Sequence, residues 1–193
     1  MTVKNPLSLF LFSLICFPAY GDAFTVKKAN SFWQNDRLLL QADIHYELNK
    51  TLLDALNNGV SLVISQRIEL HQISRYFWNE YLTDSYLWTT TQNKVIQSFQ
   101  LEYHSLSQQY TLTNLQSLTA HHYANLDKAL IALGRIKNLS LLTRKEFNPE
   151  DEYQAQIYTW LNTNELPLPL QISTYFSPEW EVISQWYRWS VLP

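Results

Sequence analysis

Three pairs of histidine and glutamate are the side chains in this sequence whose types and spacing suit chemistry. The members of each pair are two residues apart, and the pairs are His45 with Glu47, Glu69 with His71, and Glu102 with His104. Residues two apart on a β-strand project from the same side, so we expect the imidazole and the carboxylate of each pair on the same side of their strand. Three such pairs on neighbouring strands could together bind zinc, which takes histidine and carboxylate ligands. Polar strand faces in contact with water are the commoner arrangement, and we predict no metal site.

Signatures of known catalytic sites are absent from the sequence. It contains no G-x-S-x-G, no H-E-x-x-H and no glycine-rich phosphate loop. His121 and His122 are adjacent, so on a strand they face opposite ways, and we expect them to flank the start of a helix. Glu179 and Glu181 are expected in an exposed turn before the last strand. We therefore predict a protein that is not an enzyme and has no cofactor.

The first 23 residues have the three-part layout of a secretory signal peptide. Lys4 precedes an apolar core at 6–17, and small residues follow at cleavage spacing. Cleavage is expected after Gly21 or Ala23. The rival interpretation is an uncleaved anchor, but a membrane-spanning helix needs about 20 apolar residues. We predict a cleaved signal peptide, 1–23, and a single β-rich domain, 24–193, in the bacterial periplasm.

Export and charge exclude several classes of partner and chemistry. Cys16 is the only cysteine, so cleavage leaves a domain without thiol or disulfide chemistry. The 14 basic and 17 acidic residues give a formal charge of −3 and form no basic cluster. Nucleic acid is therefore not an expected partner. Membrane contact is expected to be peripheral at most.

Alternation with a period of two dominates the sequence and predicts β-strands. The clearest stretches are 38–48, 60–71 and 95–104, and shorter strands are expected at 24–33, 109–114, 117–123 and 153–161. A last strand at 180–192 is apolar on both sides, which predicts that both of its faces are covered. Leu166–Leu170 contains two prolines and is interpreted as an extended edge or crossing segment.

Two segments have helical periodicity and recognisable ends. The first, 50–58, has Asn49 as its N-cap and Gly59 as its stop. The second, 125–133, has Asn125 as its cap and Gly134 as its stop. The predicted fold is mainly β (α+β), an antiparallel β-sandwich or open barrel with two short helices.

Aromatic residues are numerous, with 7 Trp, 12 Tyr and 9 Phe. Most are expected in the core, because each buries a large area. The segment 76–88 does not alternate cleanly, and its aromatic residues are a candidate interaction patch. The residues of this patch are Tyr76, Phe77, Trp78, Tyr81 and Trp88.

Several stretches, taken in order, resemble one protein family. The stretches are Gly59-Val60-Ser61-Leu62, Arg75-Tyr76-Phe77-Trp78, Tyr103-His104-Ser105-Leu106-Ser107-Gln108-Gln109-Tyr110, Ala129-Leu130-Ile131-Ala132-Leu133-Gly134, Leu166-Pro167-Leu168-Pro169-Leu170, Trp180, and Ser184-Gln185-Trp186-Tyr187-Arg188-Trp189. Together they resemble the proteobacterial domain of unknown function 4390 family. The resemblance implies an exported bacterial protein without assigned activity, whose gene in relatives often lies beside that of a membrane sensor histidine kinase. Asn162 stands where the family resemblance leads us to expect aspartate.

The leading functional expectation is a non-enzymatic protein-interaction module of the cell envelope. It would dock on an envelope or membrane protein through the 76–88 segment or through an open sheet edge. The alternative is a carrier that holds a small lipidic or aromatic ligand in a β-sandwich or barrel cavity.

Overall fold

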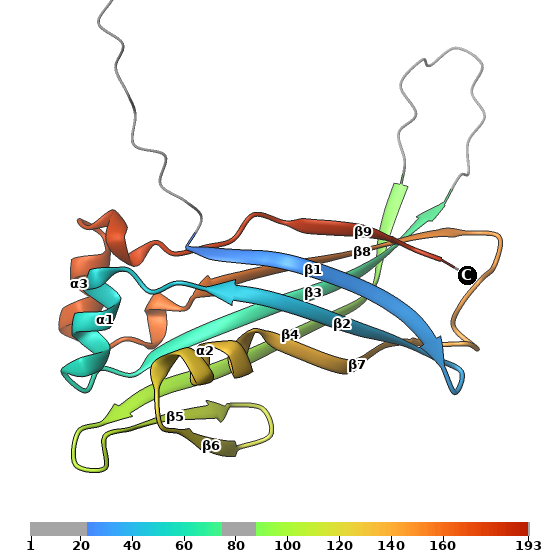
Figure 1. Ribbon diagram of the computed structural model, residues 1–193. Helices are drawn as coiled ribbons and strands as arrows, with labels where there is room; N and C mark the ends of the chain where they lie inside the picture. The colour runs from blue at the N-terminus through green and yellow to red at the C-terminus, as the bar shows by residue number, and fades with distance from the viewer. Residues whose placement is uncertain (1–22, 75–87, 193) are drawn as a thin grey trace, which may run out of the picture.

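Two antiparallel sheets face each other in this computed structural model, which describes residues 23–74 and 88–192 (Figure 1). The smaller sheet has the order β1-β2-β7 and the larger one the order β6-β5-β4-β3-β8-β9. The strands are β1 (Phe24–Gln34), β2 (Arg37–Tyr46), β3 (Leu62–Ser74), β4 (Trp88–His104), β5 (Gln109–Asn114), β6 (Thr119–Tyr123), β7 (Arg135–Thr143), β8 (Glu152–Leu161) and β9 (Tyr187–Val191). No closed barrel forms within these residues, and the predicted mainly β, sandwich-like fold is confirmed.

The long hairpin β3–β4 is the centre of the larger sheet. Its strands pair from Leu62 opposite Leu101 to Ser74 opposite Trp88, with one bulge at Leu70/His71. β8 pairs with the other edge of β3, so β3 is hydrogen-bonded on both sides. Of the residues that the alternation assigns to the core, Leu62, Ile64 and Leu101 are buried. Val95, Phe99 and Tyr103 of β4 are half-buried and pack against the core.

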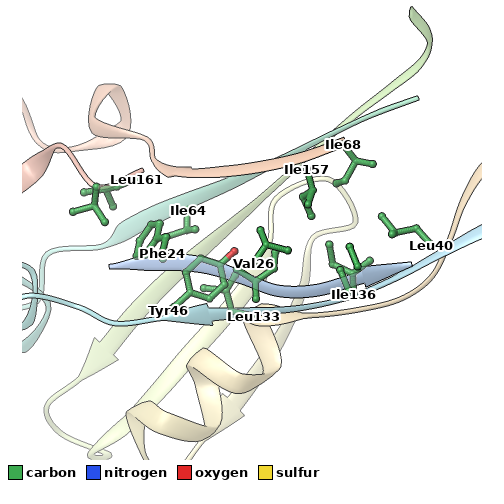
Figure 2. Packing of buried hydrophobic residues seen from close by; sticks show 14 of the residues in the cluster. Phe24, Val26, Leu40, Tyr46, Ile64, Ile68, Leu133, Ile136, Ile157 and Leu161 are labelled. Carbon is green, nitrogen blue, oxygen red and sulfur yellow. The ribbon is translucent and has the colours of Figure 1, made fainter. Parts of the chain in front are cut away.

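The core lies between the two sheets and is closed at one side by a helix. Figure 2 shows Phe24, Val26 and Tyr46 of the smaller sheet opposite Ile64 and Ile157 of the larger one. The even-numbered residues of β2 and the segment after it, from Leu38 to Leu48, are all buried, as their alternation predicts. Leu133 enters the core from the helix α2 (Leu126–Gly134).

Both predicted helices are present with the predicted N-caps. In α1 (Lys50–Asn57) the side chain of Asn49 accepts a hydrogen bond from the Leu52 backbone N–H at 2.9 Å. In α2, Asn125 does the same for Lys128 at 3.0 Å. Each cap satisfies a backbone donor that the first turn leaves without an intrahelical partner. None of the helices that the structure describes is long and apolar enough to span a bilayer.

The prediction of an extended segment at 166–170 is wrong. The 3-10 helix η1 (Thr163–Glu165) is followed by a third α-helix, α3 (Leu168–Thr174). Pro169 is accommodated in its first turn, where a backbone N–H has no intrahelical partner in any case. The buried Leu166 and the half-buried Leu170 attach this segment to the core.

Only the end of the strand predicted over 180–192 forms a strand, β9, and the prediction that both of its faces are covered is wrong, because Arg188 and Ser190 are exposed. Residues Pro178–Trp180 form the 3-10 helix η2, and Ile183 makes only an isolated bridge to Trp160. The strand β9 begins at Tyr187 and lies at the edge of the larger sheet. The apolar pattern arises because Trp180 and Val182 are buried from an irregular segment, not from a two-sided strand.

The strand β7 was not among the predicted strands. Its alternation is broken because Asn138 adopts a positive φ of 53° and the pairing with β2 shifts register twice. As a result the adjacent residues Leu141 and Leu142 are both buried. Bulges of this kind place neighbouring side chains on one side of a strand, which hides the period of two.

Candidate functional site

The three histidine–glutamate pairs do not meet. His45 lies on β2 in the smaller sheet, whereas the other two pairs lie on β3 and β4 of the larger one. Glu69 is opposite Lys94, eight residues before Glu102 along β4, which corresponds to roughly 27 Å of strand. Among the residues that the structure describes, no three His, Cys, Asp or Glu side chains are placed to hold a metal ion.

One pair, Glu69 with His71, belongs to a network on the outer face of the larger sheet. The Nε2 atom of His71 lies 3.1 Å from Glu69 Oε2, and Arg67 Nε lies 2.9 Å from Glu69 Oε1. From β8, Gln156 Nε2 donates to Glu69 Oε2 at 2.7 Å. From β9, Arg188 Nε donates to Gln156 Oε1 at 3.0 Å. The network thus joins side chains from three neighbouring strands.

The carboxylate at the centre of this network is held in its charged form. Burial raises the pKa of Glu69, but hydrogen bonds from Gln156 and His71 and the charge of Arg67 lower it by more. The pKa of Glu69 therefore lies below its usual value. Its side chain is 12% exposed, so the charge is fixed at the surface by its neighbours.

Three aromatic rings lie beside this network. Tyr158 stacks on Trp160 with ring centroids 5.3 Å apart and on Trp186 with centroids 4.9 Å apart. Tyr158 is directly opposite Arg67 in the pairing of β8 with β3. All three rings are half-buried. Together with Arg67, Glu69, His71, Gln156 and Arg188, they form what we call the outer-face site.

Sequence reasoning missed these aromatic residues, although a signal for them exists. In β8 the alternation assigns Tyr153, Ala155 and Ile157 to the core, and all three are buried. Tyr158 and Trp160 therefore fall at positions of the opposite, outer face. Large aromatic side chains at positions that alternation assigns to solvent are the signal that could have located the site.

The predicted aromatic patch lies almost entirely outside the described residues. This holds for Tyr76, Phe77, Trp78 and Tyr81. Trp88 is the first residue of β4, where it pairs with Ser74. The patch remains a prediction.

The remaining predicted polar residues lie at the surface. His121 and His122 are exposed on β6, four and three residues before the cap of α2 at Asn125, as expected. The Oγ1 atom of Thr111 lies 3.0 Å from His122 Nδ1. Glu179 and Glu181 are exposed in and after η2, before the last strand.

The surface hollows of the described part of the chain include two that are lined by residues of the turns and of η2. One, of about 300 Å³, is lined by residues on both sides of η2, including Trp180, Glu181 and Val182. The other, of about 420 Å³, lies at the β1–β2 and β7 turns around Arg37 and Arg144. Neither lies between the sheets, where core side chains fill the space (Figure 2). A ligand carrier of the predicted kind would hold its ligand between the sheets.

Comparison with known proteins gives one match. Neither the curated proteins nor the solved structures contain a match to this chain. The family described as "Domain of unknown function (DUF4390)" matches residues 21–190. Because this match covers nearly the whole described fold, the chain belongs to the DUF4390 family.

Proposed function

We propose that the chain is exported to the bacterial periplasm and acts there as a non-enzymatic protein-interaction module. The signal-peptide layout of residues 1–23 supports export. The outer-face site supports binding to a protein: Trp160, Tyr158 and Trp186 stand on an open sheet face beside two arginines. Tryptophan, tyrosine and arginine are the residues that dominate the energetics of protein interfaces.

The charges of the site select the chemistry of the partner. Arg67 and Arg188 belong to the network, and the exposed Lys94 lies opposite Glu69. Within this set of groups one carboxylate lies among three cations, so the set carries a net positive charge. We therefore propose a partner surface with an apolar centre and carboxylates around it. The family resemblance makes the periplasmic part of a membrane sensor kinase the first partner to examine.

A site-specific photo-crosslinking experiment tests this proposal in intact cells. A photoreactive residue is placed at Ile96, which is exposed on the same face and is paired with Arg67. A second chain has it at Leu118, an exposed residue of the β5–β6 turn. We expect a discrete protein adduct from position 96 and none of the same mass from position 118.

Substitutions in the site then show whether the aromatic residues make the contact. Trp160→Ala should reduce the adduct several-fold. Trp33→Ala is the matched control, because Trp33 is a half-buried tryptophan on β1 of the smaller sheet, where it packs against Phe147. An adduct that survives Trp160→Ala unchanged, or the same adduct from both photoreactive positions, would contradict the proposal.

A further inference from the structure

The helix α3 exposes an apolar face at one end of the sandwich. Leu168, Ile172, Tyr175 and Phe176 are 75%, 63%, 83% and 84% exposed. They are spaced as i, i+4, i+7 and i+8, which is one side of a helix, and Tyr175 continues the right-handed turn with φ −69° and ψ −20°. The other large apolar residues that are exposed are scattered. We call these four residues the apolar tip.

The tip is rigidly supported on its inner side. Leu166 is buried, and Leu170 packs against the core. Gln171 Nε2 donates to the carbonyl oxygens of Asn164 and Leu166, both at 2.7 Å. The backbone N–H groups of Tyr175 and Phe176 donate to Ile172 and Ser173 at 3.3 and 3.1 Å. The apolar side chains are therefore presented outward by an ordered element.

The tip lies at the end of the molecule where the chain enters the fold. In Figure 1, α1, α3 and the beginning of β1 are at the same end of the sandwich. The Glu47 backbone N–H donates to the Ala23 carbonyl at 2.7 Å, and α1 begins at Lys50. The helices α1 and α3 both contact η2, where Asn49 Nδ2 donates to the Glu179 carbonyl at 2.6 Å.

The sequence before β1 places this end close to a membrane during export. The apolar core of the signal peptide ends at Phe17, and β1 begins at Phe24. Seven residues span at most about 25 Å. While that core is inserted in the bilayer, the beginning of β1, which lies at the same end of the domain as the apolar tip, is held within this distance of the lipid surface.

We infer that the apolar tip of α3 contacts the lipid interface and orients the domain on the membrane. Leucine, isoleucine, tyrosine and phenylalanine on one side of a surface helix suit the boundary between head groups and acyl chains. A short apolar face alone binds a bilayer weakly, and stable attachment takes a second element. The inference rests on the export part of the proposed function but not on the outer-face site.

The charges around the tip determine which lipids it suits. Glu165, Glu179 and Glu181 are exposed on the segments that flank α3. Carboxylates are repelled by anionic head groups within a Debye length of about 8 Å at physiological salt. The tip should therefore contact zwitterionic lipid more closely than anionic lipid.

Fluorescence quenching on vesicles tests this inference with the full chain. In a Cys16→Ser background, a single cysteine carries an environment-sensitive dye at Ile172→Cys, Lys50→Cys or Asp36→Cys. Lys50 is an exposed polar residue at the same end, and Asp36 is in the β1–β2 turn at the other end. The protein is reconstituted into vesicles of phosphatidylcholine and phosphatidylethanolamine that contain lipids with a nitroxide just below the head group.

We expect quenching at position 172 to be several-fold stronger than at position 50 and negligible at position 36. Tyr175→Ser with Phe176→Ser should lower the quenching at 172 to the level at 50, with an unchanged far-ultraviolet circular dichroism spectrum. Adding phosphatidylglycerol should weaken the quenching at position 172, and Trp160→Ala should not change that quenching. Equal quenching at positions 172 and 50 would overturn the inference.

Discussion

Gln66 Nε2 donates a hydrogen bond to the hydroxyl of Tyr46 at 2.9 Å and so joins the two sheets inside the core. The Tyr46 hydroxyl lies 3.0 Å from Thr159 Oγ1, and Thr159 Oγ1 donates to the Ser65 carbonyl at 3.0 Å. Because the Thr159 proton is directed to Ser65, Tyr46 must donate to Thr159. The result is a continuous chain of hydrogen bonds from Gln66 to Ser65, and all four residues are buried.

This buried chain predicts that Tyr46→Phe destabilises the fold. Phenylalanine keeps the ring contact with Phe24, whose centroid is 4.8 Å away. It removes one of the two acceptors of Gln66 Nε2, which keeps the Leu133 carbonyl at 2.9 Å, and it leaves Thr159 Oγ1 without a donor. Tyr46 is buried, and the removal of its hydroxyl from water raises its pKa. A buried polar group left unpaired costs about 1–3 kcal/mol, and urea unfolding should show that loss. Tyr175→Phe, at an exposed position, is the control, and an equal midpoint for both variants would contradict the prediction.

A second prediction concerns the two glycines that follow or end helices. A Cβ atom on Gly134 would lie 1.9 Å from the Ile44 carbonyl oxygen, so α2 approaches the β2 backbone as closely as a glycine allows. Gly59 has a φ of 84° and free space around it. Gly134→Ala should therefore lower the free energy of unfolding by about 3 kcal/mol or more, and Gly59→Ala by about 1–2 kcal/mol.

Thermal or urea unfolding of the two variants measures this difference. Gly59→Asn is a useful control, because asparagine tolerates the left-handed conformation better than alanine does. It should be the mildest of the three changes. If Gly134→Ala proved no worse than Gly59→Ala, the close approach of α2 to β2 would be refuted.

A third prediction is a pH-dependent contribution from Glu69. Its pKa is lower in the folded protein than in the unfolded chain, so its charge stabilises the fold at and above the unfolded pKa of about 4.3. That stabilisation is lost as the pH falls through the lower folded pKa. Glu69→Gln should cost about 1–2 kcal/mol at pH 7, and this cost should shrink progressively below about pH 4.

Urea unfolding of the wild type and of Glu69→Gln at pH 7 and in acid measures the effect. Glu47→Gln, at an exposed position of another pair, should change stability by no more than about 0.5 kcal/mol at either pH. A cost of Glu69→Gln that is the same at both pH values would show that the amide fails for steric reasons instead.

Much of the local structure could be predicted because it depends on neighbours in sequence. Asn49 and Asn125 cap helices through bonds to residues three positions later, and the alternation from Leu38 onward follows from strand geometry. The strand β7 and the helix α3 could not be predicted in this way. In β7 a bulge at Asn138 breaks the alternation with a period of two. In α3 proline is tolerated only because it lies in the first helical turn.

The outer-face site illustrates the same limit. Spacing placed Glu69 beside His71, and the structure confirms that contact. The spacing of residues could not identify Gln156 and Arg188 as members of the network, because they are 87 and 32 residues from their partners in it. Those contacts depend on strand order and register, which the pattern of one strand does not encode.

The sequence by itself determined most of the strands, where two of the helices begin, and which side of most of those strands is buried. These features follow from propensities, capping bonds and periodicity within a few residues. Only the tertiary structure decided that β2 joins a different sheet from β3, and so separated His45 from Glu69 and His71. It also decided that Tyr46 and Gln66 meet in the core, because the packing of one sheet on another depends on contacts between residues distant in sequence.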